Sequence, residues 1–317
     1  RGVKRIVRKI NPKRLPKADL YFDCTGFKSL LNDSPWVDMS HILPNNSAVV
    51  TRFAYNNKEE QMKPVTDCVA LDNGWCWNVP TWTRIGSGYV YCDKFCSDKE
   101  AIDEFRDYLA ENVESDVGRY SDKMFRVIKW TTGRRETMWN GNVVSIGLSA
   151  GFIEPLESNG ILSIHNFLLM FLRVMDGRKV VTQVMRDTFN NNCNGSFDEF
   201  ATFVAAHFAL TQRNDTPYWQ HICDKNYPDE NSMFKFQRNL GLPSSVFGDA
   251  YSWGDLAGEG SFYVQAGHGW NPFSDLIYKE LNYYQGGGVP EHVPDPWKGI
   301  DKLQCPYDYY KDTIYAS

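Results

Sequence analysis

The sequence predicts a mixed α/β fold of the α+β kind, in which a sheet-rich first half is followed by a helical second half. Two observations support this prediction. In the first half, short runs of β-branched and aromatic residues alternate with Pro, Asn and Asp. After residue 160, apolar residues instead recur at helical spacing. The 317 residues suffice for one large domain or about two, and we expect a sheet domain over 1–160 and a helical domain over 161–317.

Charge and hydropathy restrict the partners of the chain. Its formal net charge of -5 disfavours binding to nucleic acid or to an anionic membrane surface. No apolar run reaches the ~20 residues that a membrane helix needs, because the longest, from Phe167 to Met175, contains Arg173. The basic segment 1–14 lacks the apolar stretch of a signal peptide and is typical of the interior of a domain. We therefore expect a cytoplasmic protein with no nucleic-acid or membrane partner.

The cysteines and aromatic residues indicate which ligands to expect. The 8 cysteines lack the spacing of a disulfide framework, so reduced thiols are expected. Cys92 and Cys96 have no second pair or nearby His that would complete a zinc site, and we expect no bound metal. Aromatic residues make up 15% of the chain, enough to build flat walls for a planar ligand.

The individual elements follow from local patterns. Strands are expected at 3–7, 18–26, 47–55, within 75–92 and at 141–147, because β-formers there are bounded by turn residues. A helix is expected from Ser97, where Ser97 and Glu100 form a capping box and Ile102, Phe105 and Leu109 share one face.

The second half predicts further helices. One runs over 161–177, with apolar residues at 161, 164, 168, 171, 172 and 175 and a stop at Gly177. Another is expected over 200–213, after a second capping box formed by Ser196 and Glu199. From about residue 240 the sequence is rich in Gly, Pro, Tyr and Trp, which predicts long surface loops.

The stretch "GFIEPLESNGI" at 151–161 carries the chemistry that the sequence offers. It places Glu157 and Ser158 just before a helix, where the first N–H groups have no intrahelical partner and the helix dipole is positive. Asn159 and Gly160 can offer main-chain N–H groups to a small anion, and a nearby carboxylate can act as a general base. The strand before it ends in small residues, including Gly147, that allow a ligand to approach the backbone closely.

Each of these features also has a purely structural explanation. Acidic residues are common in first turns because they complement the dipole, and Ser or Asn is an ordinary cap, so spacing alone favours a helix start. The aromatic segment "WCWNVP" at 75–80, taken alone, is a buried strand ended by proline. Taken together and in order, however, the segments are specific.

Five segments resemble the flavin-dependent halogenases of the tryptophan-halogenase type. The one at 141–161 resembles the signature of that family, and Trp75, Trp77 and Pro80 match its W-x-W-x-(I/V)-P pattern. The five segments are "DLYFDCTGFKSLL" at 19–31, "GWCWNVPTWTRIGSGYVYCDKF" at 74–95, "IKWTTGRRETMW" at 128–139, "GNVVSIGLSAGFIEPLESNGI" at 141–161 and "HFALTQRNDTPYW" at 207–219.

The resemblance implies both a fold and a reaction. The fold is an FAD-binding, flavin monooxygenase-like mixed sheet domain with a helical substrate domain. Reduced FAD (FADH2) reacts with O2 and oxidises a halide ion, which can be chloride, bromide or iodide, to hypohalous acid. A tunnel then carries this oxidant to a lysine and a glutamate beside an electron-rich aromatic substrate. The implied partners are a small aromatic substrate, a separate NAD(P)H-dependent flavin reductase and a possible second copy of the chain.

The resemblance also assigns residues by position. The catalytic residues are Glu157, which takes the proton of the substituted ring or orients the oxidant, and Ser158, which relays the oxidant. Asn159 and Gly160 bind halide through main-chain N–H groups. The flavin-facing residues are Gly26, Gly147, Ala150 and Gly151, and the tunnel and wall residues are Trp75, Trp77, Pro80, Phe152 and Pro155.

Two departures from the family pattern stand out. The family usually has Thr where this chain has Asn159, and we hypothesise that the change favours larger, more easily oxidised halides. No G-x-G-x-x-G follows a strand, and the lysine-bearing segment of the family is missing too. We therefore expect this sequence to lack the N-terminal FAD-binding part, so that no lysine in it is assigned to catalysis.

Substrate and source are the least determined features. We expect a small indole or phenol, since the last part of the chain does not resemble the tryptophan-binding lid of the family. The divergent tail and the Asn-rich "FNNNCNG" would suit a viral or marine microbial member. Two other functions stay open: a non-halogenating flavin monooxygenase of the same fold, and a truncated, non-catalytic relative.

Overall fold

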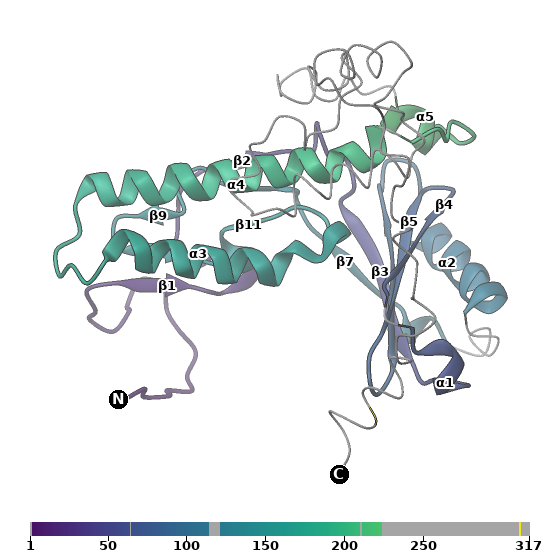
Figure 1. The fold of residues 1–317 in the computed structure, drawn as a ribbon, viewed down its shortest axis with the longest axis horizontal. Coiled ribbons are helices and arrows are strands. Elements are labelled where there is room, and N and C mark those ends of the chain that lie inside the picture. Colours follow the sequence, from purple (N-terminus) through teal and green to yellow (C-terminus); the bar gives the residue numbers. More distant parts are fainter. Residues whose placement is uncertain (1, 64, 114–120, 210, 224–310, 312–317) are drawn as a thin grey trace, which may run out of the picture. The chain divides into compact units, whose positions relative to one another are not determined.

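The computed structural model describes residues 2–63, 65–113, 121–209, 211–223 and 311. Within these residues the chain is a mixed α/β structure (Figure 1). It divides into two compact units, each built from separate stretches of sequence. The first unit comprises Arg1–Pro44 and Trp130–Val204, and the second comprises Asn45–Lys129 and Ala205–Ser317. The predicted domain boundary at residue 160 stays a prediction.

The first unit contains two small sheets. In the order β1–β10–β9, strand β1 (Tyr21–Asp23) pairs in parallel with β10 (Val143–Ser145), which pairs antiparallel with β9 (Trp139–Asn140). In the order β11–β8–β2, strand β8 (Gly133–Arg135) pairs antiparallel with both β11 (Gly151–Phe152) and β2 (Trp36–Asp38). Short 3-10 helices follow several of these strands: η1 (Gly26–Lys28), η4 (Gly147–Ser149) and η5 (Leu156–Ser158).

Helices α3 (Asn159–Met175) and α4 (Gln183–Ala209) are the long helices of Figure 1. They pack antiparallel, because Phe167 contacts Phe197 while Phe171 contacts Phe189, with ring centroids 6.1 and 6.2 Å apart. The chain leaves α3 through Asp176 and Gly177, whose φ values of 37° and 67° are left-handed and end the helix where Gly177 predicts it.

The buried face of α3 carries polar as well as apolar residues. Its buried residues are Asn159, Ser163, Phe167 and Phe171, whereas Ile161, part of the apolar pattern that predicts the helix, is 83% exposed. Polar residues at 159 and 163 therefore lie on the inner face.

The second unit is built on one antiparallel sheet with the order β4–β5–β6–β3–β7. Helix α2 (Asp98–Asn112) begins with the predicted capping box, in which both reciprocal Ser97–Glu100 hydrogen bonds are present. Its residues Ala101, Phe105 and Leu109 are buried and belong to the same core as Val49 and Tyr89 of the sheet. The remaining elements of this unit are β3 (Ser47–Phe53), α1 (Lys58–Gln61), β4 (Asp67–Leu71), β5 (Gly74–Pro80), β6 (Ile85–Tyr91), η3 (Asp122–Met124), β7 (Arg126–Lys129) and α5 (Pro217–Cys223).

Two predicted elements are wrong. Residues 3–7 form no strand, and Val3 is 99% exposed, so their β-forming residues find no partner strand within the described part of the chain. Ser196 and Glu199 do not start a helix, because α4 runs unbroken past them and Ser196 is buried inside it. A serine followed by a glutamate three residues later is a capping box only where the chain before it is not already helical. The predicted loops beyond residue 240 lie outside the described residues, apart from Lys311.

Candidate functional site

The parallel strands β1 and β10 end side by side, and each is followed by a glycine in a left-handed conformation. Asp23 is paired with Ser145 at the ends of the two strands. Gly26 and Gly147 then adopt φ values of 72° and 66°. The carboxyl ends of neighbouring parallel strands are where open α/β sheets bind their ligands. The two predicted glycine turns are thus brought to the same sheet edge.

Buried polar side chains hold these two turns together. The Asp23 carboxylate accepts hydrogen bonds from the backbone and side chain of Thr25, at 2.9 and 2.6 Å, and from the Leu31 amide at 2.8 Å. The Ser149 hydroxyl donates to the main-chain oxygens of Asp23 and, at 2.8 Å, of Ile146. Asp23 and Ser149 are completely buried, so the turns form one rigid edge.

The four predicted flavin-facing residues differ in what surrounds them. A Cβ on Gly26 would meet no atom of the described residues within 4 Å. A Cβ on Gly147 would come within 3.2 Å of Ile164 on α3. Ala150 is buried, and a Cβ on Gly151 would lie 2.5 Å from the Phe197 ring, so packing alone explains the small residues there. Of the four, Gly26 and Gly147 are the two with left-handed φ values.

The segment between β11 and α3 places its two glutamates in opposite environments. Glu154 is completely buried, whereas Glu157 is exposed. Pro155, between them, is half-buried and its carbonyl accepts a hydrogen bond from the Ser158 amide at 3.0 Å. Of the two carboxylates, Glu157 is therefore the one open to a reacting group.

Glu157 and Ser158 have an unusual backbone conformation. Both are left-handed, with φ values of 67° and 54°. For residues other than glycine this costs about 1–3 kcal/mol each, and such strain concentrates at functional sites. A left-handed residue followed by a right-handed one also turns successive N–H groups toward the same side, which forms an anion-binding concavity. Ser158 (left-handed) and Asn159 (right-handed, φ -67°) have this arrangement.

The start of α3 has the properties of an anion site. Ser158 is its N-cap residue but makes no capping hydrogen bond with its side chain. The first-turn amides, including those of Asn159 and Gly160, have no acceptor within the helix. A Cβ on Gly160 would meet no atom of the described residues within 4 Å. The predicted halide-binding pair therefore lies at a helix N-terminus whose N-cap side chain makes no capping hydrogen bond.

The side chain of Asn159 adds a further donor to this turn. Asn159 is 8% exposed, and its Nδ2 is buried without a hydrogen-bond partner among the described residues. Leaving such a donor unsatisfied costs about 1–3 kcal/mol. A Thr at this position, as in the family pattern, would not carry this amide.

Sequence analysis missed an aromatic group beside the Gly26 turn. Phe152, predicted to line the tunnel, packs edge-to-face against Phe27 and Trp130, with ring centroids 5.3 and 5.4 Å away. Phe27 follows Gly26 directly and is 46% exposed. The sequence signal that could have revealed this group was an aromatic residue directly after the predicted glycine turn.

Trp75, Trp77 and Pro80 lie on β5 in the second unit. The two indoles project from the same face of the strand, with centroids 5.8 Å apart. Trp77 is paired with Gly88 on β6, and a Cβ on Gly88 would come within 2.2 Å of the indole. Glycine at 88 therefore allows the Trp77 ring to lie against the sheet. Pro80 is half-buried at the last position of the strand.

The described cysteines are thiols without a metal-binding arrangement. None of those with described side chains, Cys24, Cys68, Cys76, Cys92, Cys96 and Cys193, is in a disulfide bond. Burial raises the pKa of Cys76 and of Cys96 to about 12, so both thiols stay protonated at neutral pH. Among the described residues no group of three His, Cys, Asp or Glu side chains could hold a metal ion, and none of the helices there is long and apolar enough to cross a membrane.

Comparisons with known proteins find relatives over most of the chain. The family model described as tryptophan halogenase matches residues 8–263. The chain is 35% identical over 294 residues to the tryptophan 7-halogenase RebH of Lentzea aerocolonigenes, which covers 89% of this chain and 51% of the relative. It is 32% identical over 283 residues to the tryptophan 6-halogenase ThaL of Streptomyces albogriseolus, covering 84% of this chain and 52% of the relative.

Solved structures show the same fold. The apo structure of VirX1 superimposes with a TM-score of 0.76 at 34% identity, covering 95% of this chain and 59% of that one. The tryptophan 6-halogenase SttH from Streptomyces toxytricini superimposes with a TM-score of 0.72 at 27% identity, covering 92% and 59%. The chain spans about half the length of the curated relatives it matches. With a family model matched over most of its residues, this chain belongs to the tryptophan halogenase family.

Proposed function

We propose that this chain is part of an FADH2- and O2-dependent enzyme that halogenates an electron-rich aromatic compound of the indole or phenol type. The observation that carries the proposal is the start of α3. There the left-handed Glu157 and Ser158 lead into a helix N-terminus whose N-cap residue, Ser158, makes no capping hydrogen bond with its side chain, directly after an exposed carboxylate. An anion site beside a candidate general base is what halide oxidation followed by ring substitution requires.

The reaction balances as two steps. Reduced FAD, O2, a halide ion and a proton give oxidised FAD, water and hypohalous acid. Hypohalous acid and the aromatic ring then give the halogenated ring and water, with one C–H bond exchanged for a carbon–halogen bond. FAD supplies the two electrons when bound, and Gly26 and Gly147 are the residues we assign to its edge, with Ala150 and Gly151 as packing support behind them.

The chain's own residues have separate tasks in this scheme. The main-chain N–H groups of Asn159 and Gly160 hold the halide, because the dipole and unpaired donors of a helix N-terminus favour an anion. Glu157 accepts the proton that leaves the ring, and Ser158 hydrogen-bonds the oxidant as it passes.

Another group of residues shapes the route of the oxidant. Trp75, Trp77 and Pro80 form a wall that keeps the oxidant from bulk water, and Phe152 and Pro155 line its path.

The same scheme implies partners and a compartment. A separate NAD(P)H-dependent flavin reductase supplies the reduced flavin, and the substrate is a small aromatic molecule. The protein acts in the cytoplasm, where free thiols persist. A second copy of the chain is a further possible partner.

Product analysis tests the proposal. The full-length gene product is incubated with FAD, a flavin reductase, NADH, a halide and a panel of indoles and phenols, and the products are identified by mass spectrometry. We expect products in which one hydrogen is replaced by halogen. Hydroxylated products alone would indicate a monooxygenase of the same fold, and failure of the full-length protein to bind FAD would indicate a non-catalytic relative.

A further inference from the structure

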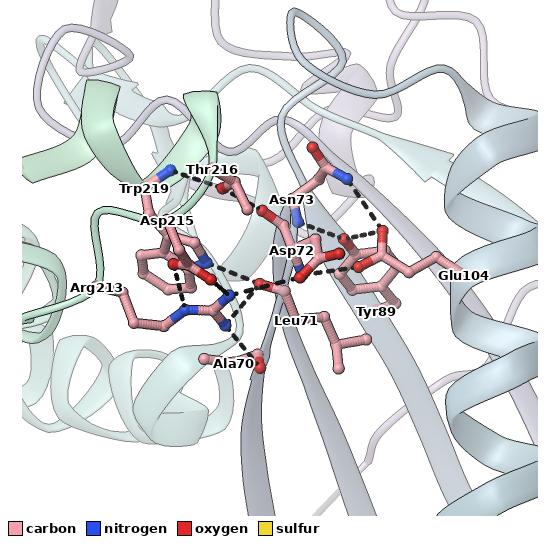
Figure 2. Close-up of polar contacts among 10 residues, drawn as sticks. All are labelled: Ala70, Leu71, Asp72, Asn73, Tyr89, Glu104, Arg213, Asp215, Thr216 and Trp219. Atoms are coloured by element: carbon pink, nitrogen blue, oxygen red, sulfur yellow. Dashed lines mark hydrogen bonds and ion pairs between the residues drawn. The ribbon is translucent and has the colours of Figure 1, made fainter.

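The two-residue turn at Asp72 and Asn73, which joins β4 to β5, is held by hydrogen bonds on both of its sides (Figure 2). Strand β5 begins directly after this turn and carries Trp75 and Trp77. Whatever fixes the turn therefore also fixes the start of the tryptophan strand.

Arg213 binds the carbonyl side of the turn. Its Nη1 donates to the main-chain oxygens of Ala70 and Leu71, both at 3.0 Å. The guanidinium is oriented by Asp215, which accepts from Nε at 3.0 Å and from Nη2 at 2.7 Å. A planar guanidinium held in this two-pronged way presents its remaining donors in a fixed direction.

The start of α5 completes this side. Trp219 donates its indole N–H to the Leu71 oxygen at 2.7 Å, and Thr216 donates its hydroxyl to the Asp72 oxygen at 2.7 Å. The Arg213 guanidinium also lies 5.0 Å from the centroid of the Trp219 ring. Three successive carbonyls of the β4 end and the turn are thus bound by one short segment, 211–219.

Glu104 of α2 and Tyr89 of β6 bind the opposite, amide side. The Glu104 carboxylate accepts from the Asp72 amide at 2.7 Å, from the Asn73 side chain at 3.1 Å and from the Tyr89 hydroxyl at 2.8 Å. The Tyr89 hydroxyl in turn accepts from the Asn73 amide at 3.1 Å. Tyr89 is completely buried, so this side is anchored in the core.

Arg213 stabilises the turn through its side-chain hydrogen bonds to main-chain oxygens and not through its ion pairs. The side chains of Asp72 and Asp215 are 72% and 56% exposed, and exposed ion pairs contribute little to stability. The bonds to Ala70 and Leu71, by contrast, are charge-assisted and fix backbone positions. A change in the register of β5 would turn Trp75 and Trp77 to the other face of the sheet, so the exact position of the turn matters.

We propose that Arg213 is a positioning residue for the proposed halogenation: by holding the turn at 72–73, it keeps Trp75 and Trp77 in place as the wall between flavin and substrate. This inference rests on the proposed function. It predicts that loss of Arg213 loosens β5 and lets the oxidant escape, while flavin oxidation itself continues.

The test compares Arg213→Ala with Arg106→Ala in the full-length gene product. Arg106 is a matched control, since it is a largely buried arginine of the same unit with ion pairs to Asp103 and Asp122 but no bond to the turn. Enzyme in excess is loaded with reduced FAD and mixed with O2, bromide and the substrate identified for the wild type. The brominated product and the released hydrogen peroxide or hypobromous acid are measured per flavin oxidised, and amide hydrogen exchange is followed in peptides covering 66–80.

We expect Arg213→Ala to lower the product per flavin by about threefold or more and to speed exchange in 66–80, with Arg106→Ala like the wild type in both. The amount of halogenated product is divided by the amount of flavin oxidised, so a smaller folded fraction of the variant does not by itself change this ratio. If Arg213→Ala fails to fold, Trp219→Phe, which removes the indole hydrogen bond to Leu71 and keeps an aromatic ring at this position, takes its place with a smaller effect of the same kind.

The outcomes separate the two claims. A wild type that halogenates, with a folded Arg213→Ala variant that keeps the same product per flavin or the same exchange in 66–80, overturns the role of Arg213 and leaves the proposed function intact. A wild type that forms no halogenated product refutes the proposed function, and with it the positioning role in halogenation. The exchange comparison then still decides whether Arg213 holds the tryptophan strand.

Discussion

Glu154 and Glu157 flank Pro155, yet the first side chain is completely buried and the second is exposed. Two carboxylates three residues apart therefore lie in different environments: one belongs to the interior of the first unit, and the other is exposed just before α3.

The same substitution at the two glutamates should separate catalysis from folding. Glu157→Gln removes the proton acceptor without changing the shape of an exposed side chain, so FAD binding should persist while turnover falls about 100-fold or more. Glu154→Gln should instead lower the melting temperature, because it alters a buried polar group. Flavin titration, product formation and thermal unfolding of both variants check this. Near-normal turnover by Glu157→Gln would remove this residue from the mechanism.

Relief of backbone strain at Ser158 should be measurable. Ser158→Gly places the one residue that tolerates φ 54° freely, so the free energy of unfolding should rise by about 1 kcal/mol. Ser163→Gly, in the regular part of α3, should lower it by about 1 kcal/mol, since glycine is unfavourable in a helix. Thermal or chemical unfolding of both variants gives the comparison. Equal destabilisation by the two changes would show that Ser158 is not strained.

Asn159 should influence which halide is used. The amide side chain changes the size and polarity of the turn that holds the anion, and we expect it to favour larger, more easily oxidised halides. Asn159→Thr should then raise the ratio of chlorinated to brominated product by about threefold or more, which corresponds to ~0.7 kcal/mol. Competition assays with mixed halides measure it, with Asn194→Thr on α4 as the control. A wild type that already prefers chloride would reject the hypothesis.

Two glycines of β6 offer a test of the tryptophan wall. Gly88→Ala places a methyl group 2.2 Å from the Trp77 ring and should lower the free energy of unfolding by about 2 kcal/mol. It should also lower the amount of halogenated product formed per flavin oxidised. Gly86→Ala, on the same strand, meets no atom closer than 4.0 Å and should be neutral or slightly stabilising. If both variants kept the wild-type melting temperature and product yield, the contact between Trp77 and Gly88 would contribute neither to stability nor to the tryptophan wall.

Local signals in the sequence predicted part of this structure well. The capping box at Ser97 and the stop at Gly177 depend on neighbouring residues only, and both are confirmed. The mixed α/β class and the family are confirmed as well. The strand at 3–7 and the helix start at Ser196 are wrong because similar short patterns occur without the surrounding structure that gives them meaning.

The parts that sequence could not predict depend on long-range contacts or on rare backbone geometry. Arg213 and Leu71 are 142 residues apart in the chain, and no local pattern announces their hydrogen bond. Glu and Ser are not residues that favour left-handed conformations, so the strained pair at 157 and 158 had no signal either. The candidate halide turn was predicted by resemblance, whereas its conformation came from the structure.

The most direct test of the account is to locate the halide. Crystals of the full-length gene product are soaked in bromide, and the anomalous scattering of bromine is mapped under conditions in which the enzyme forms brominated product. We predict a peak within hydrogen-bonding reach of the main-chain nitrogens of Asn159 and Gly160. A fully brominating enzyme whose bromide lies elsewhere, with nothing at the start of α3, would contradict the account.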